Sequence, residues 1–325
     1  MRHGIWVWLL LASCELSGPA AVDSATEDGD SDVDVDADAD VDTDTDVDGD
    51  TDTDTTTNPA VQVCNRWTGD RADLSEGSWS GDVGSCSAGD ISQSAQDNTL
   101  KLVNLYRFVA GQDPVTQDAN MSAGAQECSL MMDANNALSH APPVNWNCYT
   151  QLGADAASTS NISPTASVEA IDLYMVDPGN ETTIGHRRWI LGGWVGPIGV
   201  GGTDSYSCLM VNGDGTPGSE WVAWPPPGIF PLSAVDPSWT DIDATGWTIQ
   251  SDEVDLSNAS VTIAKDANDL PVSVTVLSNR YGSEFAISMI PQGWSTSPGV
   301  YHVEVTGAAI QIAYDVEVVD CSQLP

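Results

Sequence analysis

The chain is organised around the stretch Gly185-His186-Arg187-Arg188-Trp189-Ile190-Leu191 and the segment that leads to it from Asn135-Asn136-Ala137-Leu138-Ser139-His140. Each piece carries one histidine next to the end of a predicted helix. The whole chain has only four histidines. Neutral imidazole is the commonest metal ligand in proteins and the usual acid or base near neutral pH. His140 and His186 are therefore the first candidates for a functional site.

Helical patterns surround these two histidines. Apolar residues recur at helical spacing from 97 to 110 and again from 118 to about 138, and Pro142-Pro143 forbid any continuation of the second helix. Ser163-Pro164 fit the N-cap and first position of a third helix, which Asp177-Pro178-Gly179 would end. Short apolar strands come after His186. Helices followed by buried strands predict a layered α/β core.

The apolar period becomes two from about residue 235. Val272, Val274 and Val276 alternate with polar residues, and later segments repeat this pattern. Such strands, separated by Gly, Pro and Asn turns, predict an antiparallel β-sandwich of the immunoglobulin-like type. The stiff sequence Trp224-Pro225-Pro226-Pro227-Gly228 is predicted to join it to the preceding domain.

The N-terminus is typical of an exported protein. Arg2 and His3 precede an apolar run that is too short to span a bilayer. The run closes on Leu11-Ala12-Ser13-Cys14, which resembles a bacterial lipobox and so implies cleavage before Cys14 and acylation of its sulfur. This predicts a protein tethered by lipid to the cell envelope, at the outer membrane or cell surface. The alternative is an ordinary signal peptide with an incidental cysteine.

Acidic residues dominate the segment after the predicted signal peptide. Between Asp23 and Asn58 there are sixteen acidic residues and no basic one, so repulsion predicts a disordered Asp/Thr-rich linker over 15–58. From residue 59 onward the chain has 31 acidic and 8 basic residues, a net charge of −23. Nucleic acid is therefore excluded as a partner, because phosphate binding needs clustered Lys and Arg.

Six cysteines remain once Cys14 is set aside, and an even number in an exported chain predicts three disulfides. They are Cys64, Cys86, Cys128, Cys148, Cys208 and Cys321. Pairing of neighbours favours Cys128 with Cys148 and Cys64 with Cys86, which leaves Cys208 with Cys321. Fifteen pairings are possible, and the sequence does not choose among them. No C-x-x-C spacing supports a thiolate zinc site instead.

Several short motifs occur together between about 95 and 215. They are Asn104-Leu105-Tyr106-Arg107, Gln117-Asp118, His140, Ser160-Asn161-Ile162, Ala170-Ile171-Asp172-Leu173-Tyr174-Met175 and Gly185-His186-Arg187. In this order the region resembles the CAP superfamily, also called SCP or PR-1-like, which includes the cysteine-rich secretory, antigen 5 and pathogenesis-related 1 proteins. The resemblance implies an α-β-α sandwich with a cleft that holds two His and two acidic residues. In several members that cleft takes a divalent metal.

The predicted fold class is therefore α+β, an α-β-α (CAP-like) sandwich followed by an all-β immunoglobulin-like sandwich. The predicted segments are a lipoprotein signal peptide (1–14), the disordered linker (15–58), a disulfide-tied lead-in (59–93), the CAP/SCP-like domain (94–230) and the C-terminal β-sandwich (231–325).

The resemblance also assigns site residues. His140 and His186 match the two cleft histidines, and Asp177 matches the helix acid, three positions after an aromatic residue. Ser160, before Asn161, stands where the family carries its second acid, so a mechanism that needs paired carboxylates is in doubt. Two His and one Asp still suffice for Zn²⁺ or another divalent cation with water in an open position.

Arg187 completes the predicted ligand cleft with Ser160 and Asn161, either as a clamp for an anion or in a salt bridge to a neighbouring acid. These residues allow three functions. The favoured one is non-enzymatic binding at the cell surface of a divalent metal or small extracellular ligand. The alternatives are a metal-dependent hydrolase of the peptidase or esterase kind, and a structural or adhesive module with an inactive cleft. The ligand and any protein partner stay open.

Overall fold

The computed structural model describes residues 58–211, 215, 218–238 and 240–324. All of these belong to one compact unit, Thr55–Pro325. The signal peptide, its Cys14 and the acidic linker up to residue 57 lie outside the described residues, and they stay predictions. Within the described residues no helix is both long enough and apolar enough to cross a membrane.

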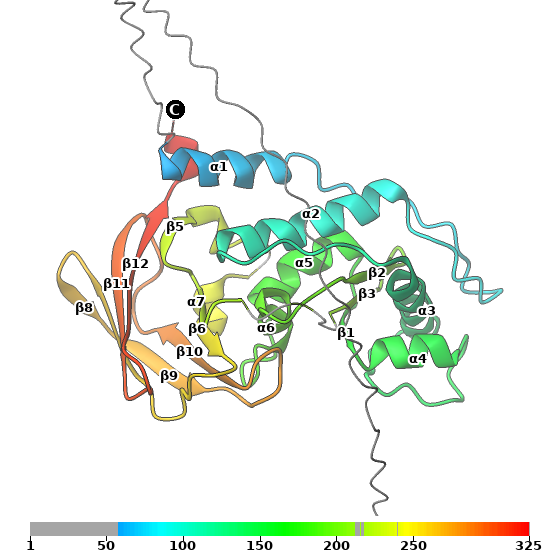
Figure 1. Cartoon of the computed structure of the whole chain (residues 1–325). Coiled ribbons are helices and arrows are strands. Elements are labelled where there is room, and N and C mark those ends of the chain that lie inside the picture. Colours follow the sequence, from blue (N-terminus) through cyan, green and yellow to red (C-terminus); the bar gives the residue numbers. More distant parts are fainter. Residues whose placement is uncertain (1–57, 212–214, 216–217, 239, 325) are drawn as a thin grey trace, which may run out of the picture. The chain divides into compact units, whose positions relative to one another are not determined.

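The first part of this unit is built from helices and short strands. The helices are α1 (Pro59–Asp70), α2 (Gln93–Val109), α3 (Ala119–Asn135), α4 (Gln151–Ala157), α5 (Ser167–Val176) and α6 (Gly185–Leu191). The strands are β1 (Ser160–Ser163), β2 (Gly199–Gly202) and β3 (Ser207–Met210), which pair antiparallel in the order β1-β3-β2. Helices α3 and α4 contact this sheet from one side, and α2 and α5 contact it from the other (Figure 1).

The sequence explains where several helices begin and end. Asp118 caps α3, because its carboxylate accepts from the backbone N–H groups of Asn120 and Met121 at 2.8 and 2.9 Å. Helix α5 ends where it was predicted to end, with Asp177 in the left-handed conformation at φ 59°. Its predicted start at Ser163-Pro164 was wrong. Ser163 pairs with Ser207 in the sheet, and α5 begins at Ser167.

Two glycines let α3 lie directly on the sheet. A Cβ atom on Gly201 would lie 2.2 Å from the backbone carbon of Ala125. The same atom on Gly199 would lie 2.4 Å from the backbone carbon of Met121. Real Cβ atoms do not come this close, so the Gly-Val-Gly sequence of β2 is what permits the contact between helix and strand.

The six cysteines among the described residues form three disulfides, as predicted, but the favoured pairing of neighbours was wrong. The bonds are Cys64–Cys321, Cys86–Cys148 and Cys128–Cys208. Each joins segments that are far apart in the chain, with sequence separations of 257, 62 and 80 residues. Cys128 lies on α3 and Cys208 on β3, so that bond ties the helix to the sheet it covers.

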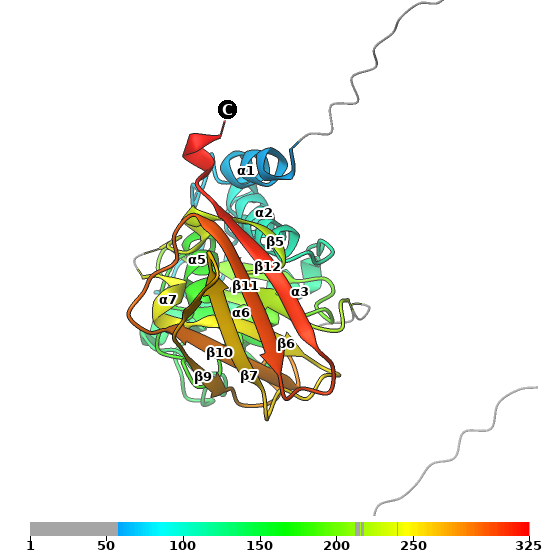
Figure 2. The same cartoon turned by 90° about the vertical axis from the view of Figure 1, so that its left-hand side faces the viewer.

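The second part consists of two sheets. One sheet contains, in order, β4 (Val222–Trp224), β6 (Trp247–Ser251), β10 (Phe285–Pro291) and β9 (Val272–Val276). The other contains β5 (Gly228–Pro231), β12 (Ile312–Val319), β11 (Gly299–Thr306), β7 (Ser260–Lys265) and β8 (Asn268–Leu270). All neighbours are antiparallel except β5 and β12. Strands β12, β11 and β7 run side by side in Figure 2.

The predicted alternation of buried and exposed residues is confirmed on β12, whereas on β9 Val272 and Val274 are only partly buried and Val276 is exposed. The buried residues of β12 are Ile312, Tyr314, Val316 and Val318, and the residues between them are exposed. The two sheets meet through aromatic residues, since the rings of Trp247 on β6 and Tyr301 on β11 lie 5.4 Å apart, edge to face. The mixed α+β fold with a strand-rich C-terminal region is thus confirmed, whereas the immunoglobulin-like type stays a prediction.

One hydrophobic core runs through both parts. It includes Tyr106 of α2 and Met175 of α5 together with Trp247 and Val303 of the two sheets. The predicted joining segment is divided between the sheets, because Trp224 ends β4 and Gly228 begins β5. The predicted domain boundary at residue 230 stays a prediction.

Candidate functional site

The two predicted histidines line the same cavity. This cleft has a volume of about 400 Å³ and is bordered by His140, Ser160, Asn161 and His186, among others. His140 comes from the loop after α3, Ser160 and Asn161 from β1, and His186 from the first turn of α6. One loop, one strand and one helix therefore bring together residues that are up to 46 positions apart.

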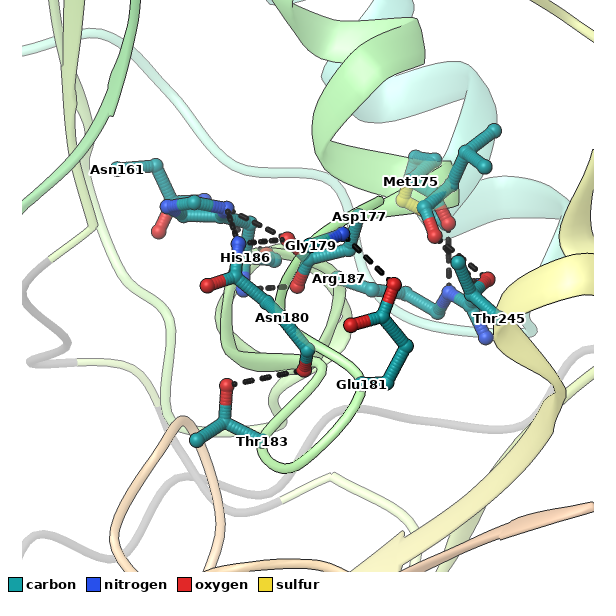
Figure 3. Close-up of polar contacts among 11 residues, drawn as sticks. Asn161, Met175, Asp177, Gly179, Asn180, Glu181, Thr183, His186, Arg187 and Thr245 are labelled. Carbon is teal, nitrogen blue, oxygen red and sulfur yellow. Dashed lines mark hydrogen bonds and ion pairs between the residues drawn. The ribbon is translucent and has the colours of Figure 1, made fainter. Parts of the chain in front are cut away.

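His186 is held by Asp177. Its Nδ1 atom lies 2.7 Å from Asp177 Oδ1, and its backbone N–H donates to Asp177 Oδ2 at 2.9 Å (Figure 3). Asn180 also donates to Oδ1, at 2.7 Å. The carboxylate is only 1% exposed. Because it is an acceptor, His186 Nδ1 carries a hydrogen, and in the neutral ring Nε2 is left as an acceptor.

His140 has a matching arrangement with a weaker partner. Its Nδ1 atom lies 2.9 Å from the carbonyl oxygen of Ala157, at the end of α4. A carbonyl only accepts, so this Nδ1 also carries the hydrogen and Nε2 again is the free acceptor. The loop itself starts at Asn136, a left-handed C-cap whose side chain accepts from the hydroxyl of Tyr206 at 2.8 Å. The cleft thus contains two imidazoles of the same tautomer.

The two β1 residues have structural roles inside the cleft. The Ser160 hydroxyl donates to the carbonyl of Ala156 at 2.7 Å, and the residue is 5% exposed. Asn161 Nδ2 donates to the backbone carbonyl of His186 at 3.0 Å (Figure 3). Asn161 therefore fixes the start of α6 against the sheet. The Ser160 hydroxyl proton is held by a backbone acceptor rather than by a histidine, which gives no nucleophile and base pair.

Arg187 does not line the cleft, contrary to the prediction. Its side chain is fully buried and extends away from His186 toward Met175 and Thr245 (Figure 3). The guanidinium donates to the carbonyls of Met175 at 2.6 Å and Gly246 at 2.7 Å, and to the Thr245 hydroxyl at 3.0 Å. Burial lowers the pKa of Arg187 to about 10, so it keeps its charge at neutral pH. It connects α6 to the C-terminal sheets rather than to a ligand.

The predicted metal ligands do not form a complete set in this geometry. The described residues contain no group of three or more His, Cys, Asp or Glu side chains placed to hold a metal ion. Asp177, the expected third ligand, has both oxygens bonded to His186 and Asn180 and does not line the cavity. A catalytic zinc ordinarily has three protein ligands. Two imidazole nitrogens do not supply these three ligands, so no chemistry is assigned to a bound metal. Binding of a divalent cation stays a prediction.

Sequence reasoning missed part of the cleft wall. Arg280 and Tyr281, between β9 and β10, line the cavity together with Trp189 and Asn180. The available signal was composition, since Arg280 is one of nine Lys and Arg residues in a chain of net charge −39 and stands in a turn-like Ser-Asn-Arg-Tyr-Gly-Ser sequence. Nothing in that sequence indicates that it folds against His186.

A largely buried ionic cluster fixes the helix that ends at Asp177. Arg71, which follows α1, forms a bidentate ion pair with Asp172 of α5: its Nη1 and Nη2 atoms donate to Oδ1 and Oδ2 at 2.7 and 2.6 Å. The Tyr106 hydroxyl donates to the same carboxylate at 2.6 Å. Burial, with the adjacent Asp172 charge, raises the pKa of Tyr106, so it stays a donor. This cluster holds α5, and thereby Asp177, against α2.

These features agree with a comparison against known families. Residues 100–207 match the family described as "CAP: Cysteine-rich secretory protein family". Residues 100–207, from within α2 to the first residue of β3, therefore match a CAP domain. Searches of curated proteins and of solved structures each found no match. The C-terminal sheets lie outside the matched residues.

Proposed function

We propose that this protein is an exported binding protein whose cleft between His140 and His186 holds a small polar ligand without chemical turnover. The observation that carries the proposal is that the Nδ1 atom of each imidazole lies within hydrogen-bond distance of a protein acceptor. Each Nδ1–H is fixed by a protein acceptor, Asp177 or Ala157, so each neutral ring offers its Nε2 lone pair. Two fixed acceptors in one cleft suit a ligand that carries hydrogen-bond donors.

Binding without turnover is proposed for chemical reasons. General acid and base catalysis needs two groups with different protonation states at the reacting atoms. Here the second family acid is replaced by Ser160, whose hydroxyl donates to a backbone carbonyl. The Asp177 carboxylate accepts hydrogen bonds from the ring and the backbone of His186 and so orients this residue. The hydrolase alternative therefore lacks the second carboxylate of the family, and its only base at the cleft would be an imidazole such as that of His186, which Asp177 orients.

Export and lipid anchoring belong to the same proposal. Three disulfides and a CAP domain are typical of secreted proteins. The lipobox-like Leu11-Ala12-Ser13-Cys14 supports attachment to the cell envelope through an acylated Cys14. Replacing Cys14 by Ser should move the full-length protein from the membrane fraction to the soluble fraction. Equal membrane retention of both proteins would rule out the lipid anchor.

Ligand binding can be tested by thermal stabilisation. The melting temperature of the full chain is measured with a library of small polar compounds, for wild type, for His140→Ala/His186→Ala and for His302→Ala. His302 is a matched control, since it is exposed on β11 and paired with Asp315, outside the cleft. A compound at a hundred times its Kd stabilises the folded state by about 2.7 kcal/mol.

We expect compounds that raise the melting temperature of the wild type and of His302→Ala but not that of the double variant. Mass spectrometry of each compound after incubation should recover it unchanged. The proposal is wrong if no compound stabilises the wild type, or if the double variant responds equally. Conversion of a compound by the wild type alone would support the hydrolase alternative instead.

A further inference from the structure

The cleft has a wall that the CAP match does not include. Arg280 and Tyr281 line the same cavity as His140 and His186, although the matched residues end at 207. We propose that this wall selects the ligand, which is a hydroxylated carboxylic acid of the sugar-acid class with its carboxylate on Arg280. The inference rests on the proposed function, because it names the ligand class of the same cleft.

The loop between β9 and β10 is fixed to the helix that carries His186. Arg188 of α6 is buried and donates to the carbonyls of Ser278 at 2.7 Å and Ser283 at 2.8 Å. Gly282 has a φ of +76°, and a Cβ on it would lie 2.4 Å from the backbone carbon of Arg188. The loop thus lies against the α6 backbone two residues after His186. The contacts with α6 therefore fix the position of the loop that contains Arg280.

The charge of the cleft favours an anion. Among the described residues that border it there is no Asp or Glu, and Arg280 is the only Lys or Arg. This is a marked local exception in a chain of net charge −39. The Asp177 carboxylate, which could repel an anion, is 1% exposed behind His186 and bonded to its ring. An anion entering the cleft meets the Arg280 guanidinium, whose exposed partner Glu284 is not among the residues that border the cavity.

Arg280 is available for such a ligand. Its one ion pair in the described structure is with Glu284, where Nε and Oε2 are 3.8 Å apart and the Arg280 side chain is 86% exposed. Exposed pairs of this kind contribute little. A guanidinium presents parallel N–H groups that match the two oxygens of a carboxylate. A ligand carboxylate can therefore replace the Glu284 contact at small cost.

The remaining polar groups specify the rest of the ligand. The two Nε2 atoms accept, so they match hydroxyl groups. In the described structure neither the Trp189 indole N–H nor the Tyr281 hydroxyl has a hydrogen-bond partner, and both residues border the cavity. Their rings also offer apolar faces beside these polar tips. An ammonium group would find no carboxylate on the wall, which favours a hydroxy acid over an amino acid.

The test uses D-galacturonate and D-galactose, of which only D-galacturonate carries a carboxylate. Binding to the full chain is measured by calorimetry for wild type, Arg280→Gln, Arg66→Gln and the double variant His140→Ala/His186→Ala. Arg66 is the matched control, because it is also an Arg with an exposed side chain in an i,i+4 ion pair but lies on α1. We expect the wild type to bind galacturonate about 10- to 100-fold more tightly than galactose, the range for a hydrogen-bonded charged group.

Arg280→Gln should remove that preference, whereas Arg66→Gln should retain it. Equal wild-type affinity for the two sugars, or no binding of either, would overturn the inference. So would a galacturonate affinity that Arg280→Gln leaves unchanged. If the histidine double variant loses binding of both sugars while Arg280→Gln keeps the wild-type preference, the binding cleft is supported and the role of Arg280 is rejected.

Discussion

Replacing the buried Arg187 of α6 by methionine should markedly lower the stability of the folded protein. Methionine keeps much of the side-chain volume but leaves the carbonyls of Met175 and Gly246 without their donors in a fully buried site. A buried acceptor left unsatisfied costs about 1 to 3 kcal/mol. Two of them give a loss of about 2 to 6 kcal/mol in the free energy of unfolding, before any change in packing.

The measurement is the melting temperature of the oxidised protein by calorimetry. For a unit of this size 1 kcal/mol corresponds to roughly 2 to 4 °C, so Arg187→Met should melt at least about 4 °C below the wild type. Arg66→Met, an exposed arginine of α1, is the control and should stay within about 0.5 kcal/mol. An Arg187→Met protein that melts with the wild type would refute the view that Arg187 connects α6 to the sheets.

Other contacts lead to three more expected outcomes. Gly201→Ala should lower the free energy of unfolding by more than about 1 kcal/mol, because the added Cβ atom would meet the backbone of Ala125. Gly69→Ala is the control and should not lower it, because no atom lies within 4 Å of the added Cβ there. Urea unfolding measures both variants. Asp177→Asn should weaken ligand binding while the fold is kept, and ¹⁵N NMR should show that the His186 ring loses its fixed Nδ1–H tautomer. After dialysis the protein should retain no stoichiometric zinc, because two imidazoles alone form an incomplete ligand set; one zinc per chain would restore the metal alternative.

Much of the cleft could be predicted because its residues are encoded locally. Asp177 ends α5 in the left-handed conformation, directly before Pro178-Gly179, a sequence that cannot continue a helix. His140 and His186 were expected together from the order of the family motifs, and one cavity is bordered by both. Period-two alternation likewise identified β12.

The rest depends on contacts that sequence patterns do not contain. Arg187 could be expected to bind an anion or an acid, but its environment is set by Gly246, 59 positions later. The disulfides show the same limit, because Cys86 and Cys148 are brought together by the packing of their loops and not by any spacing. Arg280 reaches the cleft because its loop is held by Arg188 and by the backbone hydrogen bond from Ser278 to Thr182.

The Cys64–Cys321 bond has a mechanical consequence. It joins α1, six residues after the first described residue, to Cys321 near the last described one, across 257 positions. A force that pulls the chain before Cys64 away from the chain after Cys321 is carried by this disulfide. The helices, the sheets and their hydrogen bonds between the two cysteines do not bear it. The CAP domain and the β-strands lie inside a closed covalent loop. The cleft would therefore keep its shape under a pull that unravels an unbridged domain, for as long as this disulfide stays oxidised.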